Sequence, residues 1–359
     1  MTTETRNPEL SDRDREILKA VIATYILSAE PVSSRLVAKR GGLGLSAATI
    51  RNAMADLEEW GYLAQPYTSA GRVPTGEAYH LFIESLMEER KLSARDRRYI
   101  DAHLRSSPTD AERMMQMASH LLSELSQQVG IVVTPVVGDT VLKAVDFIPV
   151  SGRKVLSVVV SATGFIDNKV IETDHPLSRE KLLEISNYLN QNFAGMTLRE
   201  IRDRLVAMMS EARAQMDRLL ALTIELASQG FAVGDQAGVV VDGTSTILSQ
   251  PELGDIQRVR RLFETFADRA RLVRMLNQCM TGTGLRVVIG KESDLTSELN
   301  FSFVATTYGI GEQPLGTLGI FGPSRMEYQK IIPLVDYLGE TLSRLLARGL
   351  GGGDQVMRS

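Results

Sequence analysis

Arg51 and Asn52 stand side by side in residues 46–60, a run whose apolar spacing predicts one helix. Arginine can donate two hydrogen bonds to O6 and N7 of guanine, and asparagine can form a similar pair with N6 and N7 of adenine. At about 100° per residue, both side chains lie opposite the apolar side of the helix. That apolar side consists of Ile50, Ala53, Met54 and Leu57. The pair therefore favours the reading of base edges in a DNA groove.

Small residues surround this pair. Ala48 and Ala55 share the outward face, where a solvated helix would carry lysine and glutamate, and they leave room for close approach to a base pair. Thr49 or Ala48 can contact the methyl group of thymine. Ser46 is placed to cap the helix, so its first turn, where base contacts are expected, begins at a defined residue, and Ser46 is itself one of the residues expected to contact DNA.

The charge distribution predicts a local attraction to DNA. The 359 residues include 40 Lys and Arg against 44 Asp and Glu, a net charge of −4, so the whole chain has no basic excess. Between residues 31 and 55, however, every charged residue is basic, Arg35 and Lys39 among them, and Arg72 is the charged residue of 61–76. We expect these side chains to meet phosphates. The alternative is an ordinary solvated face on a generic three-helix core.

The elements that must position these side chains are short and clearly delimited. Ser11 and Ser33 are candidate N-caps of two earlier helices, and Gly61 is placed to end the helix of Arg51. A short strand, the polar turn YTSAGR and a second strand follow, and a further helix begins at Thr75. Helices followed by a hairpin are typical of a winged helix, which presents one helix to the major groove and a loop beside it.

The rest of the chain predicts sheet and helix in alternation. Period-two, β-branched runs occupy residues 130–174 and recur between 239 and 322, with a helical stretch between them. Two organisations fit this pattern: consecutive domains, or one sheet interrupted by an inserted helical module. A glycine-rich tail ends the chain, and we expect it to be disordered.

Residues for other chemistry are scattered. Cys279, the one cysteine, cannot form a disulfide within the chain, and the four histidines lack the spacing of metal ligands. The turns GGLGLS and GTGLRVVIG lack the features of a phosphate loop. We therefore expect no enzyme, no cofactor and no metal. The sequence has no export signal and no apolar window long enough for a membrane span, which predicts a cytoplasmic protein.

A resemblance now adds to this interpretation. The run SAATIRNAMADLEEWGYLAQPYTSAGRVPT, preceded by SDRDREILKAVIATYILSAEPVSS, resembles the N-terminal signature of the heat-inducible transcription repressor HrcA family. ATIRN, MADLE and TSAGRVPT carry most of the resemblance, and the remaining two-thirds match in layout more than in motif. It implies a bacterial repressor of chaperone operons that binds the inverted repeat CIRCE as a homodimer and is kept active by the GroEL chaperonin.

The resemblance also assigns residues and an architecture. It places Arg51 and Asn52 in a recognition helix and Thr68, Ser69 and Arg72 in the wing, whereas the run AKRGGLGLS departs from the pattern and leaves the role of Arg40 undefined. The implied fold class is α+β, with the interrupted sheet favoured over consecutive domains. Its parts are a winged helix-turn-helix domain (1–100), a discontinuous GAF-like antiparallel sheet domain (101–175 and 250–350), an inserted helical dimerisation module (176–249) and the tail (351–359).

A twofold operator requires a surface for self-association, and the long helix from residue 197 to about 228 offers a candidate. Apolar residues recur along it in steps of three and four. The predicted dimer seam consists of Leu198, Ile201, Leu205, Met208, Leu219 and Leu222. The alternative is that this stripe packs against its own domain.

Three other classes of protein stay open. A ligand-gated regulator would carry the same DNA-binding head and sense a small molecule through the GAF-like domain. A DNA-compacting protein would bind without sequence preference, which the net charge of −4 disfavours. An enzyme would need a cleft of titratable residues, which the sequence does not predict.

Overall fold

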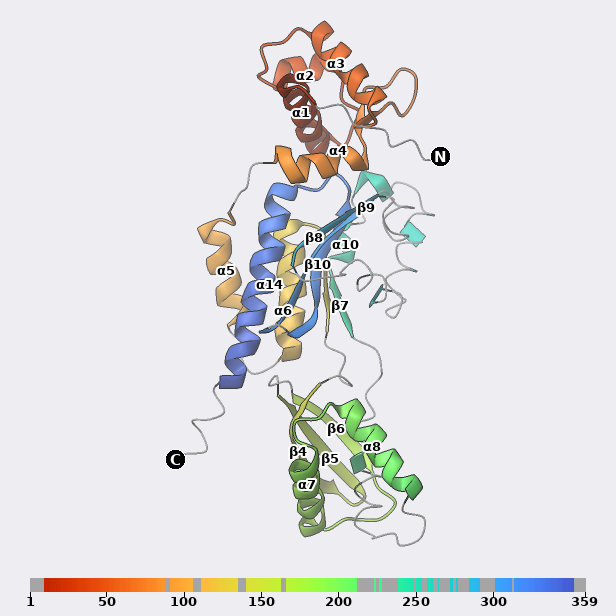
Figure 1. Ribbon diagram of the computed structural model, residues 1–359, viewed down its shortest axis with the longest axis vertical. Coiled ribbons are helices and arrows are strands. Elements are labelled where there is room, and N and C mark those ends of the chain that lie inside the picture. The colour runs from red at the N-terminus through yellow and green to blue at the C-terminus, as the bar shows by residue number, and fades with distance from the viewer. Residues whose placement is uncertain are drawn as a thin grey trace.

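The computed structural model has three lobes along its long axis: a head, a body and an insert (Figure 1). The head is residues 10–87, the body is 91–134 with 238–351, and the insert lies between 140 and 227. The structure describes residues 10–87, 91–105, 111–134, 140–162, 166–211, 238–247, 250–253, 284–290, 301–311 and 313–351, with scattered positions at 223–227 and 257–276.

The head is the predicted winged helix. Its helices are α1 (Asp12–Ser28), α2 (Ser34–Arg40) and α3 (Ala47–Glu59), followed by strands β1 (Leu63–Ala64) and β2 (Val73–Pro74), then α4 (Gly76–Leu81) and the π-helix η1 (Phe82–Leu86). The hydroxyl oxygens of Ser11, Ser33 and Ser46 accept hydrogen bonds from backbone amides of the first helical turns, at 3.3, 3.3 and 3.1 Å. The three predicted caps are therefore confirmed.

The body is built on a five-stranded antiparallel sheet in the order β7-β3-β10-β9-β8. These strands are β3 (Val129–Val133), β7 (Val239–Asp242), β8 (Arg286–Ile289), β9 (Phe301–Ile310) and β10 (Gln313–Pro323). Helices α6 (Ala111–Ser126) and α14 (Tyr328–Gly351) cover one face, and α5 (Ala94–Leu104) packs against both helices (Figure 1). In β3, Val132 joins the core under these helices, whereas Ile131 and Val133 join the core of the opposite face.

The strand pairing forms one sheet that the insert interrupts, and not two consecutive domains. Val133 at the end of β3 pairs with Val239 at the start of β7, although the whole insert lies between them in sequence. The insert has its own antiparallel sheet, β4 (Leu142–Ser151), β5 (Lys154–Ser161) and β6 (Ile166–Glu172), with α7 (Arg179–Phe193) and α8 (Leu198–Glu211). It is therefore a mixed module and not a helical one.

Three expected domain boundaries are wrong, because the elements beside them pair or pack with distant segments of the chain. The strands of 142–172, expected in the GAF-like domain, pair only with one another among the described residues and belong to the insert. Strand β7, expected in the inserted module, pairs with β3 in the body. Helix α5 crosses the expected boundary at residue 100 and packs on the body. Strand partners are chosen by long-range packing, which composition along the chain does not reveal. The tail at 352–359 lies outside the described residues.

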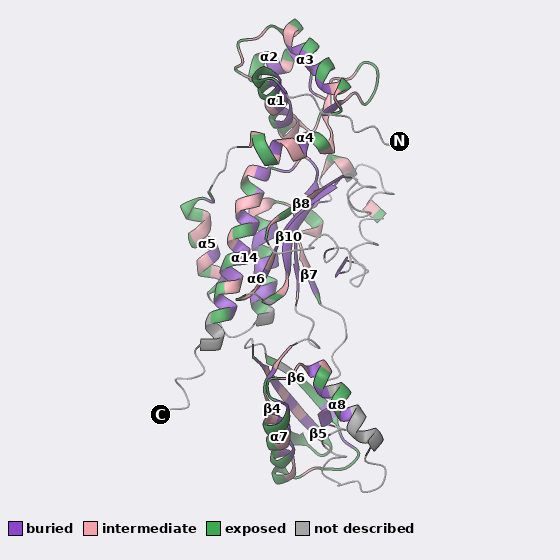
Figure 2. Cartoon of the chain, in the orientation of Figure 1, coloured by how far each residue is buried: buried purple, intermediate pink, exposed green. Residues whose placement is uncertain are grey.

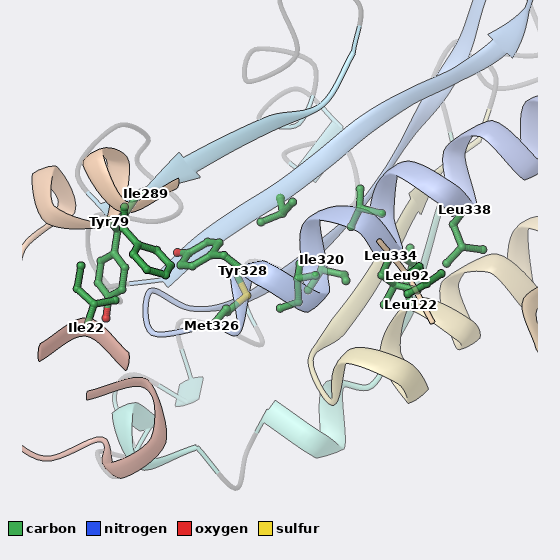
Figure 3. Packing of buried hydrophobic residues seen from close by; sticks show 14 of the residues in the cluster. Ile22, Tyr79, Leu92, Leu122, Ile289, Ile320, Met326, Tyr328, Leu334 and Leu338 are labelled. Carbon is green, nitrogen blue, oxygen red and sulfur yellow. The ribbon is translucent and has the colours of Figure 1, made fainter. Parts of the chain in front are cut away.

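Head and body share one continuous apolar core (Figure 3). Tyr79 of α4 lies beside Tyr328 at the start of α14, with ring centroids 5.8 Å apart, and Ile22 of α1 and Ile289 of β8 belong to the same cluster. Burial raises the pKa of the Tyr79 hydroxyl well above its usual value of 10. The neutral tyrosine is therefore part of the packing between the two lobes.

Candidate nucleic-acid interface

Helix α3 separates its two faces as the periodicity predicts. Ile50, Ala53, Met54 and Leu57 are buried against α1 and α2. Ala48, Arg51, Asn52 and Ala55 are exposed on the opposite side, with the exposed carboxylates of Asp56 and Glu59 toward the C-terminal end, and Figure 2 shows the helix divided between buried and exposed positions. The buried face fixes the rotation of α3 about its axis. Arg51 and Asn52 therefore point into solvent at a defined angle.

The start of α3 is held by a hydroxyl pair. The Ser46 hydroxyl oxygen accepts from the backbone amide of Thr49, and the two hydroxyl groups lie 2.9 Å apart. Thr49 is half-buried, whereas Ser46 is exposed. Both residues therefore serve the helix cap, and the exposed Ala48 is left to approach a base-pair edge.

The turn between α2 and α3 explains the departure in AKRGGLGLS. Gly42 and Gly44 have φ angles of +62° and +66°, a region that side chains rarely adopt. No atom lies within 4 Å of where their Cβ atoms would be, so the need is for backbone conformation and not for space. Arg40, whose role the sequence left undefined, is exposed at the end of α2 just before this turn.

Three of the predicted DNA-binding cations have no ion-pair partner among the described residues. Arg35 and Lys39 on α2 and Arg51 on α3 are exposed, and none has a carboxylate within ion-pair distance among the described residues. Unpaired cations release the counterions of DNA when they bind phosphate, so each can contribute to affinity. The structure leaves these three predicted residues available, with Asn52 beside them.

The wing is a short loop with internal support. Strands β1 and β2 pair through Ala64 and Val73, and residues 65–72 connect them. The side-chain amide of Gln65 donates to the carbonyl oxygens of Thr68 and Ala70, at 2.9 and 3.0 Å. Thr68 and Ser69, both predicted wing residues, are exposed on this loop. Its shape is therefore set before any DNA is met.

Arg72 is held by contacts within the head. Its guanidinium forms an ion pair with Glu58 of α3 at 2.7 Å, and the side chains are only 20% and 32% exposed. Its backbone exchanges two hydrogen bonds with Val32, at 2.8 and 2.9 Å, which join the wing to the segment that leads into α2. The guanidinium that was expected to meet phosphate is thus engaged by Glu58, and Arg72 ties the wing to α3.

Gly71 makes this junction possible. A Cβ atom at position 71 would lie 2.3 Å from the carbonyl oxygen of Val32, which is backbone and cannot move aside. The glycine in TSAGR is therefore required by the close approach of two backbone segments.

Sequence reasoning missed two residues of the wing. Tyr67 is 62% exposed, beside the exposed Thr68 and Ser69, and Gln65 supports the loop. The aromatic residue within the polar turn YTSAGR was the signal that the sequence offered for Tyr67. The contacts of Gln65 are made to backbone carbonyls and left no sequence signal.

The prediction of a dimer seam on α8 is wrong for the seam residues that the structure describes. Leu198, Ile201 and Leu205 are 2%, 0% and 2% exposed and pack with α7 and the insert's sheet. They form the core of the insert, which was the alternative for this stripe. Met208 lies in α8 with its side chain outside the described part of the structure, and Leu219 and Leu222 lie outside the described residues.

Two stretches of this chain match known protein families. Residues 9–87 match the family described as winged helix-turn-helix transcription repressor, HrcA DNA-binding, and residues 112–332 match the HrcA protein C terminal domain. The chain belongs to the HrcA family. A heat-inducible transcription repressor HrcA of Geobacter sulfurreducens is 40% identical over 94% of this chain and 98% of its own length. The one of Syntrophobacter fumaroxidans is 34% identical over 94% and 98%.

A solved structure extends the comparison to the fold. A protein described as hypothetical, with a crystal structure at 2.2 Å resolution, superposes with a TM-score of 0.67 at 26% identity, and covers 95% of this chain and 100% of that chain. Within the described residues, no helix is long and apolar enough to cross a membrane. No group of three or more His, Cys, Asp or Glu side chains gathers there as a metal site would need.

Proposed function

We propose that this protein is a sequence-specific repressor of heat-shock chaperone operons, which binds the inverted repeat CIRCE as a homodimer and blocks transcription by occupancy. The observation that carries the proposal is the outward face of α3, where Arg51 and Asn52 stand free between two alanines beside a supported wing. DNA lies in the bacterial cytoplasm, so the protein acts there. The names of its relatives, heat-inducible transcription repressors, support the same function.

The two heads read the two half-sites. In each, Arg51 and Asn52 hydrogen-bond to base edges in the major groove, and Ala48 packs against a thymine methyl. Arg35 and Lys39 contact phosphates, and the wing, with Thr68 and Ser69 exposed, reaches the neighbouring groove or backbone. Ser46, Thr49 and Arg72 act indirectly, by holding the helix start and the wing in place.

A gel-shift titration tests this function. The full chain is titrated against a CIRCE-type inverted repeat, a single half-site and a random duplex, at two salt concentrations. We expect the full repeat to bind at least a hundredfold tighter than random DNA and the half-site to bind much more weakly. Equal, weak binding to all three duplexes, with and without GroEL, would refute a sequence-specific repressor.

The outer face of the insert's sheet is the surface that we propose for dimerisation, in place of the buried seam on α8. Ile148 and Val170 both pair with Leu156 across the three strands, so the three side chains form one apolar row on the face away from α7. Ile148 and Val170 are 44% and 55% exposed, and two further apolar residues of the outer strands, Val150 and Ile166, are 57% and 51% exposed. Exposed apolar rows of this kind are typical of surfaces that bind a partner.

A second copy is the partner that a twofold operator requires. Val170→Lys should convert the dimer to monomer in analytical ultracentrifugation and lower the affinity for the full repeat. Leu183→Lys is the matched control, because Leu183 is also 55% exposed but lies on α7. Dimers that survive Val170→Lys would move the interface elsewhere.

Release on heating follows from the same apolar face. If heat dissociates the dimer, the row of Ile148, Leu156 and Val170 meets water, and a chaperonin that binds apolar surface competes for the monomer. Unfolded proteins then occupy GroEL, the repressor is not restored, and the operator is freed. Purified protein that regains full operator affinity after heating and cooling without GroEL would contradict this route.

A ligand-gated regulator is the second candidate, favoured by a cleft of about 580 Å³ where head and body meet. Its walls include Leu27, Phe82 and Pro333, with Lys91 and Lys330 among the polar residues. A thermal-shift screen of small amphipathic acids, followed by operator titration with each compound that binds, distinguishes this candidate. A ligand that changes operator affinity would support it.

A further inference from the structure

Arg325 lies in the turn between β10 and α14, at the point where the head meets the body. Its Nε donates to Oε1 of Glu252 at 2.6 Å, and its Nη2 donates to Oε2 of the same carboxylate at 3.2 Å. The Nη2 group also donates to the side-chain oxygen of Gln250 at 2.8 Å. Arg325 and Glu252 are each 14% exposed, so this fork-like ion pair is largely withdrawn from water.

The same guanidinium reaches the head. Its Nη1 donates to the carbonyl oxygen of Ile26 at 3.4 Å. Ile26 lies in the last turn of α1, whose carbonyl groups have no partner within the helix and carry its partial negative charge. No residue of that last turn is basic, so the cation at this helix end comes from the body. One side chain thus joins α1, the segment at 250–253 and the start of α14.

The surroundings make this contact important for the orientation of the head. On one side, Tyr79 packs beside Tyr328 (Figure 3). Next to it lies the cleft of about 580 Å³, whose walls come from α1, η1, the start of α5 and α14. Beside the shared apolar core, the head is therefore held by the contact of Arg325 and borders an open cleft. Domains joined by limited interfaces move relative to one another unless specific contacts prevent it.

We infer that the pair of Arg325 and Glu252 is a positioning clamp, which fixes the angle of each head on its body and so sets the half-site spacing that a dimer accepts. This inference rests on the proposed function, because spacing has meaning only for a dimer on an inverted repeat. Arg325 touches no DNA in this role. It acts through α1, which packs directly on the recognition helix α3.

Operator variants can show whether Arg325 acts on half-site spacing or on folding of the head. Full-length Arg325→Gln is compared with wild type on the full repeat, on a half-site, and on repeats whose spacer is lengthened or shortened by one and two base pairs. We expect affinity for the native repeat to fall at least tenfold, with half-site affinity within twofold of wild type. The spacer series should fall steeply for wild type and be nearly flat for the variant.

Two further variants complete the design. Glu252→Gln removes the other half of the clamp and should reproduce the flat spacer series. Arg260→Gln is the matched control, since Arg260 forms an exposed ion pair with Glu264 at 2.8 Å and its loss changes the net charge equally. It should behave as wild type on every duplex.

Each other outcome overturns the clamp. A steep spacer series in Arg325→Gln would show that the head keeps its angle without the ion pair. Equal losses on the full repeat and the half-site would show that Arg325 supports folding of the head and not its placement. If wild type itself fails to prefer the full repeat over the half-site, the proposed function fails, and the clamp's role in spacing fails with it.

Discussion

Replacing Arg72 by methionine separates the two roles that this arginine could have. Methionine keeps much of the apolar stem but removes the guanidinium that lies 2.7 Å from Glu58. The two side chains are 20% and 32% exposed, between the exposed and the buried extremes. Exposed pairs contribute about 0–1 kcal/mol and breaking buried pairs costs about 3–5 kcal/mol, so we expect Arg72→Met to lower the head's free energy of unfolding by about 1–2 kcal/mol.

The assay uses Trp60, the one tryptophan of the chain, which lies at the C-terminal end of α3. Urea unfolding followed by its fluorescence reports on the head. In parallel, the salt dependence of operator binding is measured for Arg72→Met and for Lys39→Ala. Loss of one phosphate contact reduces the slope of log K against log salt by about 0.9. We expect that reduction for Lys39→Ala and an unchanged slope for Arg72→Met, because Glu58 already neutralises Arg72.

A double-mutant cycle with Glu58→Gln serves as the control. If the two residues stabilise the head through each other, the combined variant should be less destabilised than the two single losses added together. An unchanged urea midpoint, together with a slope reduced by about 0.9, would refute the reasoning. In that case Arg72 would leave Glu58 and contact phosphate.

The remaining predictions concern the head and the body's core. Arg51→Ala should cost about 1–3 kcal/mol of operator binding and relax base choice at one position, and an equal loss on random DNA in a gel shift would contradict it. Gly71→Ala, whose Cβ would meet the Val32 carbonyl at 2.3 Å, should lower the urea midpoint of Trp60 fluorescence by more than Ser46→Ala, which removes a cap of about 1 kcal/mol. Burial raises the pKa of the Tyr308 hydroxyl well above its usual value of 10. As the pH rises, the unfolded chain therefore loses the hydroxyl proton before the folded chain does. The contribution of Tyr308 to the free energy of unfolding is thus complete below about pH 10 and declines above it. Tyr308→Phe, which also loses a hydrogen bond to the Val133 carbonyl, should therefore be less stable at neutral pH but show a shallower decline in Tm between about pH 9 and 11.

Local physics explains which parts of the head could be predicted from sequence. The caps at Ser11, Ser33 and Ser46 depend on atoms within three residues, and the burial of α3 follows from spacing on one helix. Both kinds of information are contained in short windows. The division of α3 into a buried and an exposed face was therefore predictable from the sequence.

Pairings between distant segments could not be predicted in this way. The charge pattern around Arg72 is visible in the sequence, but its ion-pair partner, Glu58, is set by how the wing folds onto α3. The apolar stripe of Ile201 and Leu205 was likewise real, but α7 and the insert's sheet cover it. In both cases the sequence indicates a property of the side chain and not what lies across from it.

The way the insert joins the body has a consequence for engineering. The amide of Thr134 donates to the carbonyl of Gly238 at 2.8 Å, so the chain leaves and returns through neighbouring antiparallel strands about 4.8 Å apart. A two-residue hairpin turn spans such a gap. Replacing residues 135–237 by Asn-Gly is thus a graft that the body's sheet can accept without changing register. In place of the insert, unrelated modules that form other oligomers can be fused to the same two strand ends.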